Sequence, residues 1–178
     1  MHAQAAAISE ATAGLCPTTE ADLGDGVFRT AEWLRAGGGF AIGSDSNVRI
    51  SVAEELRLLE YNERLRSGQR NVLTDNVMSC GRFLYQHAAN TGGVALGQAV
   101  GRLETGFRAD LVELDGSHEL LAGRSPDAAL DGWIFGGDDS MLNSVWVAGR
   151  RLVSKGRHAG EPNGRAAFAQ VMKEMLQA

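Results

Sequence analysis

Two short runs of small apolar residues restrict the fold of this chain more than any other feature. They are ATAGLC at residues 11–16 and GFAIG at residues 39–43. Each is followed by polar, turn-forming residues and then by a segment with helical spacing. Runs of this kind are typical of strands that are buried on both faces, and such strands occur in parallel sheets with helical crossovers. The alternation therefore predicts the α/β class.

The spacing of apolar residues predicts several helices. They cover residues 27–38, 52–66, about 74–90, a short piece near 92–97 and a final segment at 164–177, and residues 1–9 have the composition of a helix end. Residues 17–26, PTTEADLGDG, are rich in turn formers and are predicted to be a loop. Two βα units result, and two such units cannot bury both faces of a parallel sheet.

The helix predicted at residues 52–66 has a start signal and an apolar stripe. Ser51 and Glu54 have the spacing of a capping box, in which the side chains satisfy free amides at the helix start. The expected buried stripe is Val52, Leu56, Leu59 and Leu65, and the expected solvent face is Arg57, Glu60, Glu63 and Arg64.

The second half of the chain changes pattern. Strands are predicted at residues 109–114, at 133–137 (WIFGG) and at 144–157, the last divided by a tight turn at Ala148 and Gly149. Few helices separate these segments, so a small β unit is expected. We therefore predict one domain over residues 1–96 and another over residues 97–178.

Composition excludes several classes of function. The 178 residues carry a net charge of −5 with no basic run, which argues against nucleic acid as a partner. No stretch approaches the roughly 20 apolar residues of a membrane span, and the first residues lack a signal-peptide pattern. The two cysteines are far apart, as in cytoplasmic proteins with reduced thiols. The four histidines show no metal-pair spacing.

Several motifs resemble one family. The segments ATAGLCPTTEADLGDGVF and GGFAIGSDSNVRISVAEELRLLEYNERLRSGQRNVL resemble formimidoylglutamate deiminases of the amidohydrolase superfamily, and VGRLETGFRADLVELD and VWVAGRRLVSKGR resemble the tail of that superfamily. The resemblance implies the C-terminal portion of a TIM-type (β/α)8 barrel, with its last two βα units. Part of a small β-sandwich domain and a C-terminal helix would follow.

The resemblance also implies a role for Asp45, which follows the second apolar run. In that family an aspartate after the last barrel strand binds zinc and moves the proton of the attacking water. Histidines on other strands complete the zinc site, and they have no counterpart here. We therefore expect that this chain alone does not bind zinc stoichiometrically, and that a longer polypeptide or a partner chain holds the other ligands. Without the resemblance, the spacing alone favours Asp45 as an ordinary turn residue before a helix.

Further residues are candidates for substrate binding. The resemblance places Glu20 and Thr19 at the pocket, where Glu20 would meet the cationic amidine of the substrate. Ser46 would contact the substrate or cap the turn. A solvated loop glutamate is an equally supported alternative for Glu20.

The implied reaction is hydrolysis of N-formimino-L-glutamate to N-formyl-L-glutamate and ammonia, in histidine degradation in the cytoplasm, by a homodimer. Two alternatives stay open: a related deaminase of a purine or guanidine-like base, and a non-catalytic scaffold or binding protein.

Overall fold

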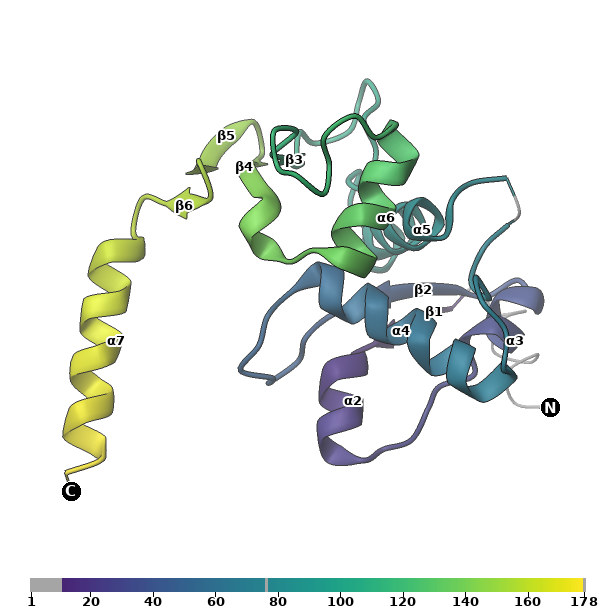
Figure 1. Ribbon diagram of the computed structural model, residues 1–178, viewed down its shortest axis with the longest axis horizontal. Helices are drawn as coiled ribbons and strands as arrows, with labels where there is room; N and C mark the ends of the chain where they lie inside the picture. Colours follow the sequence, from purple (N-terminus) through teal and green to yellow (C-terminus); the bar gives the residue numbers. More distant parts are fainter. Residues whose placement is uncertain (1–10, 76, 178) are drawn as a thin grey trace.

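The computed structural model describes residues 11–75 and 77–177, so the helix end expected at residues 1–9 lies outside the described residues. Strands β1 (Thr12–Leu15) and β2 (Gly39–Ile42) form a parallel pair (Figure 1). Thr12 is opposite Gly39 and Leu15 is opposite Ile42. Both predicted strands are therefore present, and the α/β class is confirmed.

Within the described residues, the first half has four helices. They are α2 (Pro17–Leu23), α3 (Thr30–Arg35), α4 (Val52–Ser67) and α5 (Cys80–Ala95). Helix α5 packs on β2, and α4 packs on α2 (Figure 1). The aromatic ring of Phe40 on β2 is stacked on His87 of α5, with 4.7 Å between ring centroids. His87 is thus a packing residue between helix and strand.

The second half contains an antiparallel sheet. It has the strand order β3 (Leu111–Leu114), β4 (Leu142–Val147), β5 (Arg150–Ser154) and β6 (Arg157–His158). Between β4 and β5, Ala148 and Gly149 have φ angles of 50° and 76°. Positive φ at both central residues is the geometry of a tight hairpin turn, so the predicted turn is confirmed. Helix α6 (Pro126–Gly136) and a 3₁₀ turn (Asp139–Met141) precede β4.

The buried core runs through both halves of the chain. Helix α6 packs on α5 and α4, and its Trp133 and Ile134 belong to the same buried cluster as Phe40, Leu56 and Leu84. The division at residues 96 and 97 stays a prediction, because packing continues across it.

Two predicted elements are wrong in type. Residues 17–23 form helix α2 rather than a loop, with Pro17 in its first turn and Gly24 at φ 73° after its end. Residues 133–136 belong to helix α6 rather than to a strand. Ser125 accepts a hydrogen bond from the amide of Ala128 at the start of α6. A short apolar run cannot by itself distinguish a strand from a buried helix.

The face of α4 also differs from the prediction. Leu56 and Leu59 are buried, but so are Glu60 and Glu63, which the sequence pattern places in water. The capping box is absent, because the Ser51 side chain accepts no hydrogen bond from an amide of its own helix; its hydroxyl donates to Asp139 (2.9 Å). Val52 and Leu65 are exposed.

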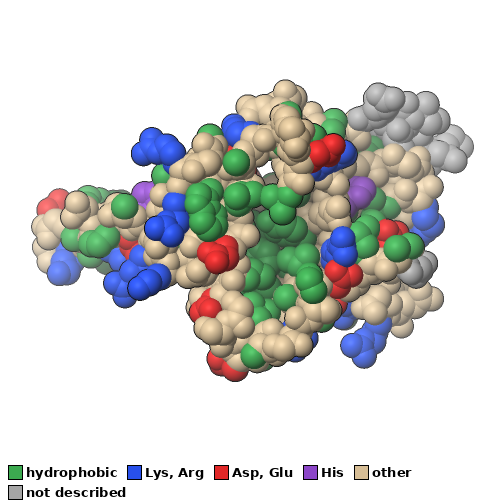
Figure 2. Space-filling view, turned by 90° about the horizontal axis from the view of Figure 1, so that it is seen from above, with side chains coloured by type: hydrophobic (Ala, Val, Ile, Leu, Met, Phe, Trp, Pro, Cys, Tyr) green, Lys and Arg blue, Asp and Glu red, His purple; other side chains and the backbone are tan. Residues whose placement is uncertain are grey.

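The surface keeps many apolar side chains accessible. Figure 2 shows them gathered in a hollow near the centre of one face, with acidic and basic side chains around it. Helix α7 (Glu161–Met175) projects from the rest of the molecule and has no buried residue (Figure 1). No helix in the described ranges has the length and apolarity that a membrane crossing requires.

Candidate functional site

The carboxyl ends of β1 and β2 lie side by side, and the predicted site residues follow them directly. The amide of Gly43 donates to the carbonyl of Leu15 (3.0 Å), which extends the parallel pairing to the ends of both strands. Residues 16–20 and 44–47 therefore meet at one edge of the sheet. Functional groups of α/β enzymes are found at this edge.

Asp45 lies in a tight turn. The amide of Asn47 donates to the carbonyl of Ser44 (3.0 Å), and the Asn47 side chain accepts from the amide of Arg49 (2.9 Å). Asp45 has φ 51°, in the left-handed region that aspartate tolerates better than most residues. Both Asp45 and Ser46 are exposed. The turn geometry predicted for Asp45 is thus present, and it leaves the carboxylate free to bind a ligand.

Glu20 and Thr19 both interact with the ends of the strands. The carboxylate of Glu20 accepts from the amide of Cys16 (2.8 Å), so it caps the start of α2. Thr19 is buried, and its hydroxyl donates to the carbonyl of Ser44 (2.8 Å). Glu20 is half-buried, and within the described residues its second carboxylate oxygen accepts no hydrogen bond.

Sequence reasoning missed Glu55. This residue lies in the first turn of α4 and is buried, and it accepts hydrogen bonds from both the amide (2.9 Å) and the hydroxyl of Thr18. The signal was its spacing: Glu55, Leu59 and Glu63 recur every four residues, which puts the acids on the same side of the helix as a core leucine.

The carboxylates near the strand ends create a negative potential, and the pKa of the Cys16 thiol is sensitive to it. Burial raises the pKa of this thiol, and the nearby carboxylates of Asp45, Glu20 and Glu55 raise it further. The side chains that the strand ends bring together are therefore mainly acidic. Cys16 is consequently a poor nucleophile.

The residues present do not complete a metal site. Within residues 11–75 and 77–177, no group of three or more His, Cys, Asp or Glu side chains has the arrangement to hold a metal ion. A zinc site needs three or four protein ligands, and here Asp45 is a single candidate ligand. Burial against Phe40 and Phe83 lowers the pKa of His87.

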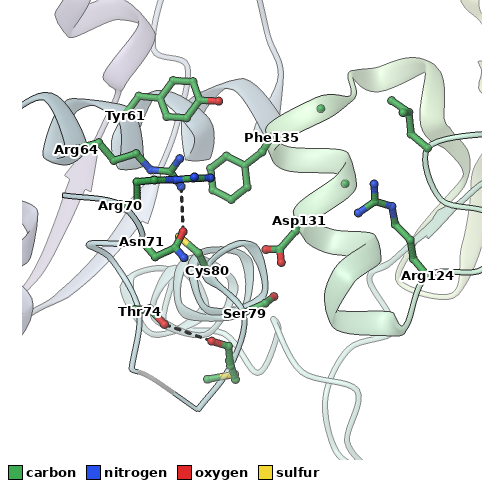
Figure 3. A pocket seen from close by; sticks show the side chains of 14 residues that line it. Tyr61, Arg64, Arg70, Asn71, Thr74, Ser79, Cys80, Arg124, Asp131 and Phe135 are labelled. Atoms are coloured by element: carbon green, nitrogen blue, oxygen red, sulfur yellow. Dashed lines mark hydrogen bonds between the residues drawn. The ribbon is translucent and has the colours of Figure 1, made fainter. Parts of the chain in front are cut away.

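A cavity of about 750 Å³ lies elsewhere, between α4, α5 and α6 (Figure 3). Arg64, Arg70 and Arg124 line it together with Asp131 and Phe135. Arg64 is already engaged, because its guanidinium pairs with Glu60 (2.7 Å) and lies over the Phe135 ring. Asp45 and Glu20 are not among the lining residues, so this cavity is separate from the predicted site.

Known proteins resemble this chain over nearly its whole length. It is 51% identical over 173 residues to a formimidoylglutamate deiminase from Pseudomonas aeruginosa, which covers 97% of this chain and 38% of that protein. A crystal structure of an amidohydrolase from Brucella melitensis is 43% identical, with a TM-score of 0.88, over 98% of this chain and 38% of that one. The chain thus spans about two-fifths of the length of these relatives.

A more distant structure shares the fold. It is an adenosine deaminase from Xanthomonas campestris with bound zinc, 21% identical with a TM-score of 0.78, over 93% of this chain and 37% of that one. The model of the amidohydrolase family matches residues 1–152. This chain belongs to the amidohydrolase family.

Proposed function

We propose that this chain is the part of a formimidoylglutamate deiminase that carries Asp45, the last ligand of its zinc ion. The complete enzyme would hydrolyse N-formimino-L-glutamate to N-formyl-L-glutamate and ammonia, in cytoplasmic histidine degradation and as a homodimer. The observation that supports this most is the position of Asp45 at the carboxyl end of β2, within a chain 51% identical to such a deiminase.

The acidic side chains at the carboxyl ends of β1 and β2 suit the positive charge of the proposed substrate. A formimino group is an amidine and carries a positive charge at neutral pH, and Glu20 and Asp45 provide carboxylates at the same edge of the sheet. Charge-assisted hydrogen bonds of this kind are about twice as strong as neutral ones. In the proposal Glu20 and Ser46 contact the substrate. Thr19 is buried and supports the same edge of the sheet by its hydrogen bond to the Ser44 carbonyl.

Asp45 has a second task in this proposal. An exposed carboxylate can accept a proton from water and return it to the departing amine, which is general acid–base catalysis. In this proposal the histidine ligands of the zinc lie on polypeptide outside this chain.

A deaminase of a purine base is the second candidate. The likeness to an adenosine deaminase supports the fold and leaves the substrate open. A flat heteroaromatic base requires stacking partners, whereas a linear amidine with two carboxylates requires cationic groups. Comparing formiminoglutamate with adenine and guanine as substrates separates the two candidates.

The test is a hybrid enzyme. The part of the Pseudomonas aeruginosa deiminase that this chain does not match is joined to this chain, and ammonia release from formiminoglutamate is measured. We expect activity in the hybrid and a loss of at least about 100-fold in kcat with Asp45→Asn, because general acid–base groups contribute 10²- to 10⁴-fold.

The matched control is Asp22→Asn, an exposed carboxylate on α2. It should leave kcat within about twofold, as for most surface substitutions. A hybrid that folds and binds zinc without releasing ammonia would contradict the deiminase assignment and favour a scaffold role. Activity retained in Asp45→Asn would contradict the role of Asp45.

A further inference from the structure

The turn that carries Asp45 needs support from outside itself. Aspartate tolerates φ 51° better than most residues, but this left-handed conformation still costs free energy that the surroundings must offset. The Asp45 side chain is exposed, and within the described residues it makes no hydrogen bond or ion pair that would anchor it. The support therefore comes from the backbone on either side.

Thr19 provides this support from a neighbouring element. The carbonyl of Ser44 accepts two hydrogen bonds, one from the amide of Asn47 (3.0 Å) within the turn and one from the hydroxyl of Thr19 (2.8 Å) on α2. Thr19 is 7% exposed, so little water competes for this contact. It ties the residue before Asp45 to the first turn of α2.

Helix α2 is itself held by α4. The buried carboxylate of Glu55 accepts from the amide and the hydroxyl of Thr18, the residue next to Thr19. The other buried acids of α4, Glu60 and Glu63, each pair with an arginine at 2.7 Å. Among the ion pairs of residues 11–75 and 77–177 none includes Glu55, so Thr18 is its main partner.

We propose that Thr19 is a positioning residue for Asp45, held in place by Glu55 through Thr18. These contacts form a continuous chain. Glu55 binds Thr18, the neighbouring Thr19 binds the Ser44 carbonyl, and that carbonyl accepts the hydrogen bond that closes the turn carrying Asp45. The geometric part stands on this chain alone, and its catalytic consequence rests on the proposed function. A catalytic carboxylate must be held to within about 0.5 Å, which an unsupported exposed turn does not achieve.

Amide hydrogen exchange on this chain tests the geometric part. We expect Thr19→Val, which keeps the shape and removes the hydroxyl, to speed exchange of the Asn47 amide about tenfold, the equivalent of one lost hydrogen bond. Thr19→Ser keeps the hydroxyl and should restore slow exchange. Exchange of core amides such as that of Leu84 reports global stability. It allows the Asn47 rate to be corrected for any change in the free energy of unfolding.

Thr30→Val is the matched control. Thr30 is also buried, and its hydroxyl donates to the carbonyl of Phe28 (3.4 Å), remote from the Asp45 turn in sequence and hydrogen bonding. It should leave Asn47 exchange unchanged after correction. Unchanged Asn47 exchange in Thr19→Val, or failure of Thr19→Ser to restore it, would overturn the proposal. Should Thr19→Val not fold, Glu55→Gln serves instead, because it weakens the hold on Thr18 and should speed Asn47 exchange.

The hybrid enzyme tests the catalytic consequence separately. There Thr19→Val should lower kcat about tenfold with KM unchanged, because the contact fixes Asp45 without touching the substrate. A raised KM at constant kcat would overturn positioning in favour of direct substrate binding by Thr19. An inactive hybrid would count against the proposed function alone, since the exchange result does not depend on it.

Discussion

Asp45 combines two properties that sequence reasoning treats as alternatives. It is a turn residue with φ 51°, and it is an exposed carboxylate at the carboxyl end of a parallel strand. The left-handed conformation turns the chain sharply after β2. A short polar side chain can then stand clear of the sheet, so the turn geometry is compatible with a ligand role.

The thiol of Cys16 gives a test at the scale of single residues. Because the charge of Asp45 raises the pKa of this thiol, Asp45→Asn should lower that pKa and increase the thiolate fraction at a given pH. We expect the alkylation rate of Cys16 at pH 8 to rise about two- to threefold, since only the thiolate reacts. Peptide-resolved mass spectrometry measures it.

Cys80 is an internal control for this experiment. Burial raises the pKa of its thiol to about 12, so it stays protonated and unreactive at pH 8 in folded protein. Asp22→Asn should leave the Cys16 rate unchanged. An equal rate for Cys16 in Asp45→Asn and in the unmodified chain would show that the two groups are not coupled.

Helix α4 shows the limits of pattern analysis at the scale of elements. Its length and its central leucines are as predicted, but Glu60 and Glu63 are buried, whereas the sequence pattern places them in water. Sequence patterns place glutamate in water because burying a charge is costly. Here the cost is offset by backbone amides of distant segments. Glu60 accepts from Val72 and Leu73, and Glu63 accepts from Ala31.

Removing one of these carboxylates should therefore destabilise the fold strongly. Glu60→Ala leaves the amides of Val72 and Leu73 without their acceptor and Arg64 without its ion pair. We expect the free energy of unfolding to fall by about 3 kcal/mol or more, as for other broken buried pairs. Denaturant unfolding measures this.

The comparison for α4 is Glu174→Ala on α7, which removes an exposed glutamate paired with Gln170. It should change the free energy of unfolding by less than about 0.5 kcal/mol. A similarly small effect for Glu60→Ala would mean that the carboxylate is not a structural acceptor.

At the scale of the whole molecule, two sheets of different kinds are joined by helices. The parallel pair β1–β2 carries the candidate site, the antiparallel sheet β3–β4–β5–β6 follows, and α5 and α6 pack between them in one core (Figure 1). Helix α7 stands outside this core. Its Phe168, Val171 and Met175 are exposed along one face.

Helix α7 should accordingly contribute little to the stability of the rest. Ending the chain after Gly160 removes no buried side chain from the described residues, so the free energy of unfolding should change by less than about 0.5 kcal/mol. Ending it after Ala148 also removes β5 and β6 from the sheet and should cost clearly more. Denaturant unfolding of the full chain and of the two shortened chains measures these free energies. A large fall in the free energy of unfolding on removing α7 alone would show that α7 packs on the core.

The sequence by itself determined the parts that depend on local pattern. Two small apolar runs predicted the parallel strands, Ala148 and Gly149 predicted the hairpin turn, and the motifs around Asp45 predicted the family. Period and turn chemistry are local, so a single sequence contains them.

Only the tertiary structure decided which polar groups are buried and what they contact. The contacts of Glu55 with Thr18 and of Thr19 with Ser44 join residues 37 and 25 positions apart. The helical state of residues 133–136 likewise depends on packing against α5, since the run suits either state. The burial of a polar group and the helical or extended state of an apolar run depend on partners distant in sequence. The reason is that the surrounding groups in space determine the free energy of burying either one.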